Sequence, residues 1–305
     1  MSAFIDQHRA RFGVEPICRE LQVAPSTYYA AKARGPSRRA QREVWLQRAI
    51  AAVHADNYGV YGADKVWAAL NRQGVAVARC TVERLMQRLG LRGAVRGRVL
   101  RTTRGVQGQP RPADLVQRVF QAPAPNRLWV ADFTYVRTQS GWVYVAFIID
   151  VYSRRLVGWQ AATSPRRELA QEALETALWQ RRGERLDRLV HHSDRGSQYV
   201  AVRYSERLAA VGALASVGSK GDSYDNALAE STIGLYKTEL VHRHGPWPSI
   251  TELELATLTY VDWWNHRRLH GALGLVPPSE REAAHHATQL DTIDTMFKTE
   301  RPRLH

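Results

Sequence analysis

Three acidic residues stand at positions where chemistry is the best explanation for a charge. Asp132 interrupts a strand-like apolar pattern. Asp194 closely follows the apolar pair Leu189-Val190, at the carboxyl end of a second predicted strand. Glu230 comes near the start of a predicted helix, with 35 residues between it and Asp194. Because an unpaired buried charge is costly, acids within strand patterns favour a site over chance placement.

Carboxylates on two strands and a helix suit metal-assisted phosphoryl transfer. Their hard oxygens bind Mg²⁺ or Mn²⁺ and leave coordination positions for phosphate and water. Two such ions about 3.5–4 Å apart can hold the attacking and leaving oxygens of an in-line displacement. We therefore predict that Asp132, Asp194 and Glu230 are both catalytic residues and ligands of two Mg²⁺ or Mn²⁺ ions. For any one acid taken alone, a solvated surface charge or a helix cap is the more common role.

A lysine follows the last of these acids by two helical turns. Lys237 lies seven residues after Glu230, so a regular helix would present both side chains on one face. Lysine is a point charge on a flexible stem and can meet a phosphate. The alternative is a surface lysine that pairs with Glu239 or Asp225.

Longer sequence words carry a resemblance to a known family. Segments 129–135 (WVADFTY), 192–199 (HSDRGSQY) and 221–230 (GDSYDNALAE) resemble the OrfB transposases of the insertion-sequence-3 family. These have a DDE catalytic core like that of retroviral integrases. The resemblance covers nearly the whole chain, and several long words in the right order make it specific.

The resemblance implies an activity and its partners. It implies a DDE transposase that cleaves the 3′ ends of an insertion sequence and uses the freed 3′-OH for strand transfer, giving DNA integration and recombination. The expected partners are double-stranded DNA (element ends and target), an OrfA-type protein or a fusion with it, and further copies of the chain on DNA. The expected DNA contacts in the core are Lys237, Arg195, Arg267 and Arg268.

Two other functions use the same features. A non-catalytic DNA-binding regulator could keep an integrase-like fold, but we would then expect at least one of the three acids to be lost. A ribonuclease H acting on RNA–DNA hybrids shares the metal chemistry. The basic modules before the core and the spacing of Lys237 argue against this second alternative.

The order of predicted elements gives the fold class. Three β-rich runs lead into a predicted helix, residues 167–180, and further strands and helices alternate as far as the Glu230 helix. The order β-β-β-α-β-α-β-α predicts an RNase H-like integrase core of the α/β class, a mixed five-stranded sheet with flanking helices. We place this core at residues 125–285 and expect a loosely ordered tail at 286–305.

The excess positive charge lies ahead of this core. The chain has a net charge of +14, and residues 1–112 hold 20 Lys/Arg against 7 Asp/Glu. Phosphate neutralisation is the sequence-independent source of affinity for nucleic acid, so this asymmetry indicates DNA-binding modules. We predict a short helical or helix-turn-helix segment at 1–40, a helix-turn-helix module at 41–92 and a basic linker at 93–124.

The second module has a predicted recognition helix. Thr81 is expected to cap this helix, and Arg79, Arg84 and Arg88 are expected to contact phosphates. The two cysteines lie far apart, no run of 18 apolar residues exists, and the N-terminus has no signal-peptide pattern. These features predict a cytoplasmic protein without a membrane partner, and the family resemblance implies that it is bacterial and nucleoid-associated.

Overall fold

The catalytic region is built on one twisted sheet. The structure is a computed structural model that describes residues 1–95, 121–193, 202–217 and 226–299. Its strands are β1 (Leu128–Thr138), β2 (Gly141–Asp150), β3 (Leu156–Ala162), β4 (Val190–Ser193) and β5 (Leu214–Val217). They form a sheet of order β3-β2-β1-β4-β5. The first three are antiparallel and β4 and β5 add in parallel, which confirms the predicted mixed five-stranded sheet.

Alternating side chains give the sheet two apolar faces. Along β2, Val145 and Phe147 point into one core, whereas Ala146 and Ile148 point into the other. This is the two-residue period of a strand that is buried on both sides. Helices must therefore cover both faces.

The first face is covered by α7 (Arg167–Gln180) and α8 (Val202–Ala210). Helix α7 packs very closely on β3. A Cβ atom at Gly158 would lie 2.3 Å from the carbonyl oxygen of Ala173 in α7, so only glycine fits there.

The second face is covered by a long helical path. It comprises α9 (Ala227–Tyr236), the π-helical turn η2 (Lys237–Val241), α10 (His242–His244) and α11 (Ile250–His266). This is the side of the sheet on which Glu230 and Lys237 are carried. The 3₁₀ turn η3 (Gly271–Leu273) follows α11.

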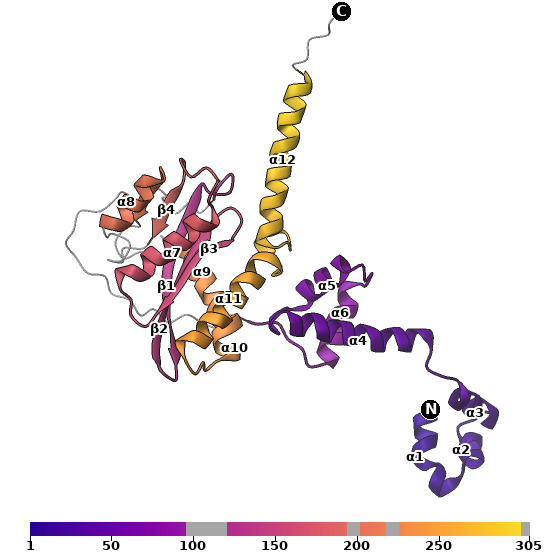
Figure 1. Ribbon diagram of the computed structural model, residues 1–305. Helices are drawn as coiled ribbons and strands as arrows, with labels where there is room; N and C mark the ends of the chain where they lie inside the picture. Colours follow the sequence, from indigo (N-terminus) through magenta and orange to yellow (C-terminus); the bar gives the residue numbers. More distant parts are fainter. Residues whose placement is uncertain (96–120, 194–201, 218–225, 300–305) are drawn as a thin grey trace, which may run out of the picture.

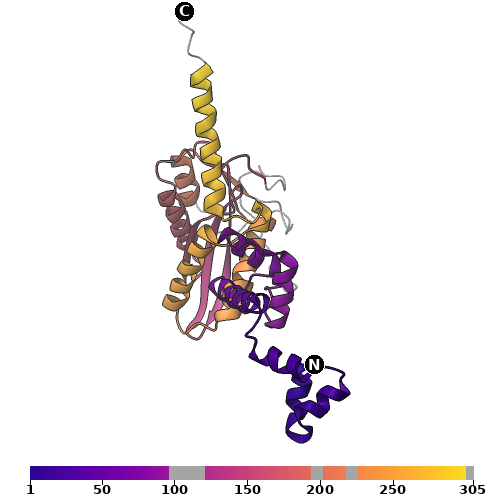
Figure 2. The same ribbon diagram turned by 90° about the vertical axis from the view of Figure 1, so that its right-hand side faces the viewer.

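A long C-terminal helix replaces most of the predicted tail. Helix α12 (Pro278–Thr299) begins on the core and projects away from it (Figures 1 and 2). Its first turns are held by Glu282, which is buried and bonded to Arg181 at 2.5 Å, Arg155 at 2.8 Å and the Ser153 hydroxyl at 2.8 Å. The expectation of a loosely ordered tail from residue 286 was wrong, because the anchored helix continues past that point.

The N-terminal region holds two helical units. The first consists of α1 (Ser2–Phe12), α2 (Val14–Glu20) and α3 (Pro25–Ala33), around a small core of its own: Ile5, Ile17, Cys18 and Tyr28. All three helices lie within the segment 1–40, for which the sequence predicted a short helical or helix-turn-helix unit. The second unit consists of α4 (Arg38–Asp56), α5 (Ala63–Arg72) and α6 (Arg79–Arg88).

The start of α6 differs from the prediction. The helix begins at Arg79 with Ala78 as its N-cap, and no side chain caps it. Thr81 is therefore inside the first turn and is not the cap. Three residues, Ala76 to Ala78, offer no polar side chain there, so the sequence suggested the first threonine instead.

The second N-terminal unit is fused to the catalytic core. Ile50, Leu70 and Leu85 belong to the same apolar cluster as Tyr260 and Trp263 of α11. Polar contacts reinforce this joint: the Leu269 N–H donates to the Tyr61 hydroxyl at 2.7 Å, and the Trp263 indole donates to Asn57 at 3.0 Å. The α4–α6 unit is thus placed by packing against the core, whereas α1–α3 rest on a separate core (Figure 2).

Candidate active site

Asp132 lies one residue beyond the last pair between β1 and β4. The last parallel pair of β1 and β4 is Ala131 with Ser193, one residue before Asp132. Asp132 is half-buried, and its carboxylate accepts the N–H of Phe133 at 2.8 Å. From Asp132 onward, β1 stays paired with β2, and among the described residues its other edge pairs again at Thr138, in a single parallel bridge with Trp247.

Asp194 lies outside the described residues. It directly follows Ser193, the last residue of β4, in the chain. The strand that leads to it runs beside β1, as the sequence predicted. Arg195, an expected DNA contact, also lies outside the described part of the chain.

Glu230 is held near Asp132 through the start of its helix. It is exposed and lies in the first turn of α9. The N-cap residue of α9 is Asn226, which is buried and donates its side-chain N–H to the carbonyl oxygen of Ala131 at 2.9 Å. This hydrogen bond ties the first turn of α9 to the backbone of β1 one residue before Asp132.

Sequence reasoning missed Asn226. Asparagine before a helix normally suggests a cap that bonds its own helix. Here Asn226 makes no capping bond of that kind and instead reaches across to β1. The available signal, asparagine next to the first helical residue, indicated a helix start but could not reveal a bond to a strand 95 residues earlier.

The histidines beside the site are packing residues. His191 and His192 are both buried in β4. His191 is 2.9 Å from the Tyr204 hydroxyl, and burial lowers its pKa to about 3. His192 is 2.9 Å from the Ser216 hydroxyl. A histidine that stays neutral near pH 7 and is hydrogen-bonded within the core is poorly placed to act as a general base.

Lys237 contacts an aromatic ring. Its Nζ lies 4.8 Å from the centroid of the Tyr135 ring on β1. The alternative partner Glu239 is bonded to Arg268 and Tyr260, and Asp225 lies outside the described residues. The helix changes from α to π at Lys237, so the seven-residue spacing only approximates two α-helical turns.

Arginines of the helix-turn-helix module are exposed but already paired. Arg79 bonds Asp64 at 2.5 Å, Arg84 bonds Glu43 at 3.2 Å, and Arg88 also bonds Glu43. Exposed pairs of this kind are weak, so a phosphate could replace the carboxylate at small cost.

One expected DNA contact of the core does not fit the structure. Arg268 is only 3% exposed and binds Glu239 with two N–H groups, at 2.5 and 2.9 Å. Its guanidinium also lies 4.6 Å from the Trp264 ring centroid. The basic and aromatic sequence suggested a surface, but this arginine is buried. Arg267 beside it is exposed and pairs with Asp262 at 3.3 Å.

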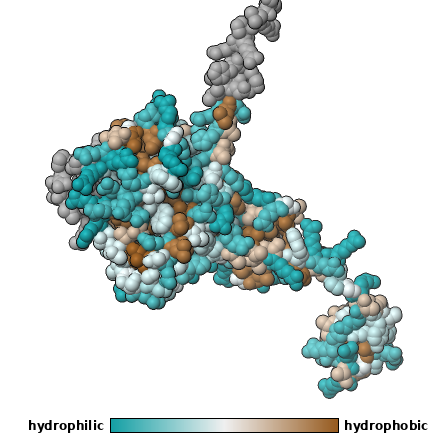
Figure 3. All heavy atoms as spheres, in the orientation of Figure 1, coloured by the Kyte–Doolittle hydropathy of each residue, from teal (hydrophilic) through white to brown (hydrophobic). Residues whose placement is uncertain are grey.

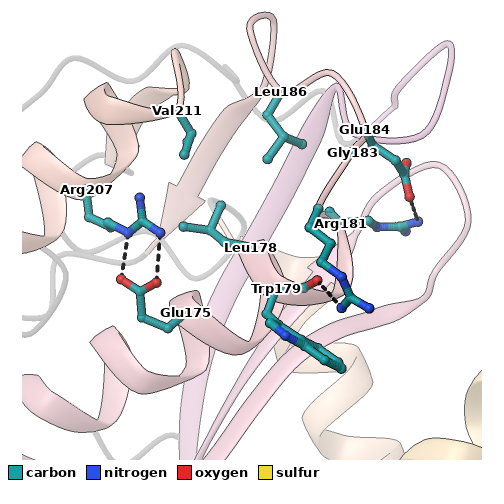
Figure 4. Close-up of a pocket in the computed structure, with 10 residues that line it drawn as sticks. Glu175, Leu178, Trp179, Arg181, Gly183, Glu184, Leu186, Arg207 and Val211 are labelled. Atoms are coloured by element: carbon teal, nitrogen blue, oxygen red, sulfur yellow. Dashed lines mark hydrogen bonds and ion pairs between the residues drawn. The ribbon is translucent and has the colours of Figure 1, made fainter.

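One surface pocket of about 430 Å³ contains none of these residues. It lies between α7, the loop after it and α8, where Arg207 bonds Glu175 and the Arg182 guanidinium lies over Trp179 (Figure 4). None of the predicted site residues lines it.

Two further properties of the described residues bear on the site. In this part of the chain no three potential metal-ligating side chains gather, and the third predicted carboxylate, Asp194, is outside it. None of the described helices combines the length and apolar character that crossing a lipid bilayer requires.

The mixed five-stranded sheet with helices on both faces is the fold of an integrase-type core. Family models agree: residues 122–223 and 212–278 match an Integrase core domain, and residues 40–99 match an HTH-like domain. The match to the HTH-like domain corresponds to the α4–α6 unit. A core of this class is a polynucleotidyl transferase that acts on DNA.

Full-length relatives give the family. A Mycobacterium tuberculosis protein assigned to insertion sequence element IS986/IS6110 is 56% identical over 270 residues, which cover 88% of this chain and 97% of the relative. The transposase for insertion sequence element IS629 of Shigella sonnei is 50% identical, covering 94% and 97%. The Escherichia coli transposase InsF for insertion sequence IS3A is 32% identical, covering 92% and 97%.

The chain belongs to the IS3-type family of insertion-sequence transposases. It is a DDE transposase that binds DNA and catalyses transposition. An integrase-type core also implies a divalent metal ion as cofactor.

Proposed function

We propose that Asp132, Asp194 and Glu230 form the catalytic set of this transposase, and that it cleaves the 3′ ends of its element and joins them to target DNA. The observation that supports this set best is the hydrogen bond from Asn226 to Ala131. It fixes the turn that carries Glu230 next to the strand residue that precedes Asp132. Asp194 follows the neighbouring strand β4 directly in the sequence.

The side chains fit a hard divalent cation. Asp132 and Glu230 supply carboxylate oxygens, the ligand type that Mg²⁺ and Mn²⁺ prefer. Asp132 is half-buried and Glu230 is exposed, so substrate has access to both. We propose two ions held by these two acids and Asp194. Bound there, they would neutralise charge at the scissile phosphate and polarise its oxygens.

We assign a separate role to each of the protein side chains at the site. The carboxylates hold the ions, and Asn226 holds the helix that carries Glu230. Lys237 binds the DNA backbone beside the scissile phosphate; in support, Glu239, one of the two partners that the alternative offered, is bonded to Arg268 instead. His191 and His192 keep β4 packed and transfer no proton.

Assembly is part of the proposal. By analogy with its family, the active form contains several copies of the chain on the element ends, together with an OrfA-type partner or a fusion with it. Sedimentation of the chain with DNA of the element ends, with and without that partner, measures the stoichiometry. A single copy per DNA end with full strand-transfer activity would contradict assembly.

The catalytic assignment is tested by Asp194→Asn. This change keeps the side-chain volume and removes the charge. We expect cleavage in Mg²⁺ to disappear and calorimetric binding of Mn²⁺ to weaken, while thermal unfolding stays unchanged. Asp187→Asn, an exposed aspartate in the loop before β4, is the matched control and should keep full activity. Near-normal cleavage by Asp194→Asn would sink the assignment.

The role of Lys237 is tested separately with pre-cleaved DNA ends. We expect Lys237→Ala to bind these ends more weakly and to join them more slowly, with unchanged Mn²⁺ binding. Lys237→Arg keeps the charge and should retain part of the activity. If Lys237→Ala binds and joins pre-cleaved ends at the wild-type rate, the lysine contacts no DNA.

A further inference from the structure

An exposed aromatic pair lies on the hairpin of β1 and β2. Tyr135 is 44% and Trp142 is 47% exposed. Their ring centroids are 5.3 Å apart, with the ring planes at 80°. The two residues lie on the same face of the sheet, because Trp142 pairs in register with Arg137, two residues after Tyr135. In Figure 1 this end of the hairpin extends past β4, on the side of α10.

A positively charged side chain lies over each of these rings. The Nζ of Lys237 lies 4.8 Å from the Tyr135 centroid, and the guanidinium carbon of Arg137 lies 5.4 Å from the Trp142 centroid. Within the described part of the chain, neither cation forms an ion pair with a carboxylate. The surface therefore combines two exposed ring faces with two positive charges that anions can still approach.

The pair lies directly beside the catalytic residues. Tyr135 is three residues beyond Asp132 in β1, about 10 Å along a strand. Strand alternation puts these two side chains on opposite faces of β1. Lys237 follows directly after α9, the helix that carries Glu230, and its contact with the Tyr135 ring links the aromatic pair to that helical segment. The distance corresponds to about three nucleotides of a stacked strand at 3.4 Å each.

We propose that Tyr135 and Trp142 form a stacking platform for an unpaired nucleobase of the DNA end on which the transposase acts. This proposal rests on the proposed function and adds a base-binding site to it. An aromatic ring stacks on any exposed base face, and neighbouring cations hold the adjoining phosphates. Paired bases inside a duplex have their faces covered, so the platform distinguishes a frayed or single-stranded end from a blunt one.

A simpler role for the same residues is local stability. A cross-strand aromatic pair stabilises a hairpin, and a cation over its ring adds to this. The chain offers a matched comparison, because Trp179 on α7 is 64% exposed and carries Arg182 at 4.1 Å from its centroid. That pair lines the pocket between α7 and α8 (Figure 4), which contains none of the predicted catalytic carboxylates.

The test compares two DNA ends with the full-length protein. Fluorescence anisotropy in EDTA measures binding without cleavage, on a blunt duplex and on the same duplex with a three-nucleotide single-stranded end. We expect Trp142→Leu and Tyr135→Leu to weaken binding of the extended end about tenfold, equivalent to about 1.4 kcal/mol, and to change blunt-end binding little. Trp142→Phe and Tyr135→Phe keep a ring and should stay close to wild type. Trp179→Leu should leave both affinities unchanged.

A second measurement detects base stacking on the wild-type protein directly, and so tests the proposal even if a leucine variant does not fold. A fluorescent base analogue in the single-stranded end should lose intensity when it stacks on the wild-type protein, and should keep it with any folded ring-less variant. Unquenched fluorescence with the wild type, or an equal loss of affinity for both DNA ends, overturns the platform. Because these measurements need no catalysis, an active Asp194→Asn variant would refute the catalytic set without affecting this result.

Discussion

Glu230 and Glu239 lie nine residues apart on one helical segment, and the fold uses them in opposite ways. Glu230 is exposed, in the first turn of α9. Glu239 is 4% exposed, accepts two N–H groups from Arg268 and also accepts the Tyr260 hydroxyl at 3.0 Å. A buried carboxylate whose two oxygens accept from an arginine serves structure, whereas a carboxylate at the surface can bind a cation.

The position of the segment explains the difference. Its start is tied to β1 beside the end of β4, and Glu230 there is exposed. Its end, η2, packs beneath α11 and close to the α4–α6 unit, in the same apolar cluster as Tyr61 and Trp263. The buried pair of Glu239 and Arg268 thus fixes the far end of the helix whose near end carries Glu230.

The largest expected effect concerns the accessible glutamate. Glu230→Gln keeps the shape and removes the charge. We expect the rate of cleavage to fall by about 10³-fold or more, since a charge aimed at the reacting phosphate is lost in a site built around it. The free energy of unfolding should change by less than about 0.5 kcal/mol, because the side chain is exposed. Cleavage assays and urea unfolding of the same preparation measure both.

The next largest effect concerns the buried pair of Glu239 and Arg268, where we expect a loss of stability and not a direct loss of catalytic rate. Arg268→Met leaves Glu239 buried without its cation, and we expect a loss of about 3–5 kcal/mol in the free energy of unfolding. Any loss of activity should follow the unfolded fraction. The double variant Glu239→Gln/Arg268→Met removes both charges and should recover most of the stability. A double variant no more stable than Arg268→Met would show that the pair is not what holds this end of the helix.

The free energy of unfolding should depend on pH through a lysine where the α4–α6 unit meets the core. Lys65 of α5 lies with its Nζ 5.3 Å from the Tyr61 ring centroid. Burial lowers its pKa to about 8, and the neighbouring Arg268 acts in the same direction. The unfolded chain therefore binds more protons between about pH 8 and 10.5, so this lysine costs stability below pH 8 and the cost disappears as pH rises to about 10.5.

Lys65→Met should accordingly stabilise the protein by about 1–3 kcal/mol at pH 7. The difference from wild type should shrink toward zero near pH 10.5. Chemical unfolding of both proteins at a series of pH values gives this difference directly. A stabilisation that does not change with pH would mean that Lys65 keeps its ordinary pKa in the folded state.

These cases show what the sequence could and could not predict. The order of β-rich runs and helices predicted the sheet, and helical periodicity predicted α7 with its observed bounds, since these patterns can be read along the chain. The pairing of Arg268 with Glu239 was not predictable, because it joins residues 29 apart through the packing of two helices. The run of residues 264–270 looks like a basic surface in the sequence, but in the fold Arg268 is buried while Arg267 stays exposed.

The candidate site divides in the same way. Residue types and spacing predicted Asp132, Asp194, Glu230 and Lys237 as a set, and the set stays a prediction for its catalytic role. The bond from Asn226 to Ala131 and the ring beneath Lys237 were missed, because each joins a helix to a strand about 100 residues away. Thr81 was misplaced as a cap because the loop before α6 has no polar residue to mark the helix start.

The smallest expected effect lies in the helix-turn-helix module, where ion pairs are exposed and not buried. Glu43 holds both Arg84 and Arg88. Glu43→Gln should lower stability by no more than about 1 kcal/mol, the usual limit for exposed pairs. The freed arginines should then bind DNA about 1.4- to fivefold more tightly, equivalent to about 0.2–1 kcal/mol. The dependence of affinity on salt should keep its slope, because the number of phosphates contacted does not change. Weaker DNA binding by Glu43→Gln would instead show that Glu43 orients the two arginines toward the phosphates, and that even an exposed pair in this protein is a positioning device.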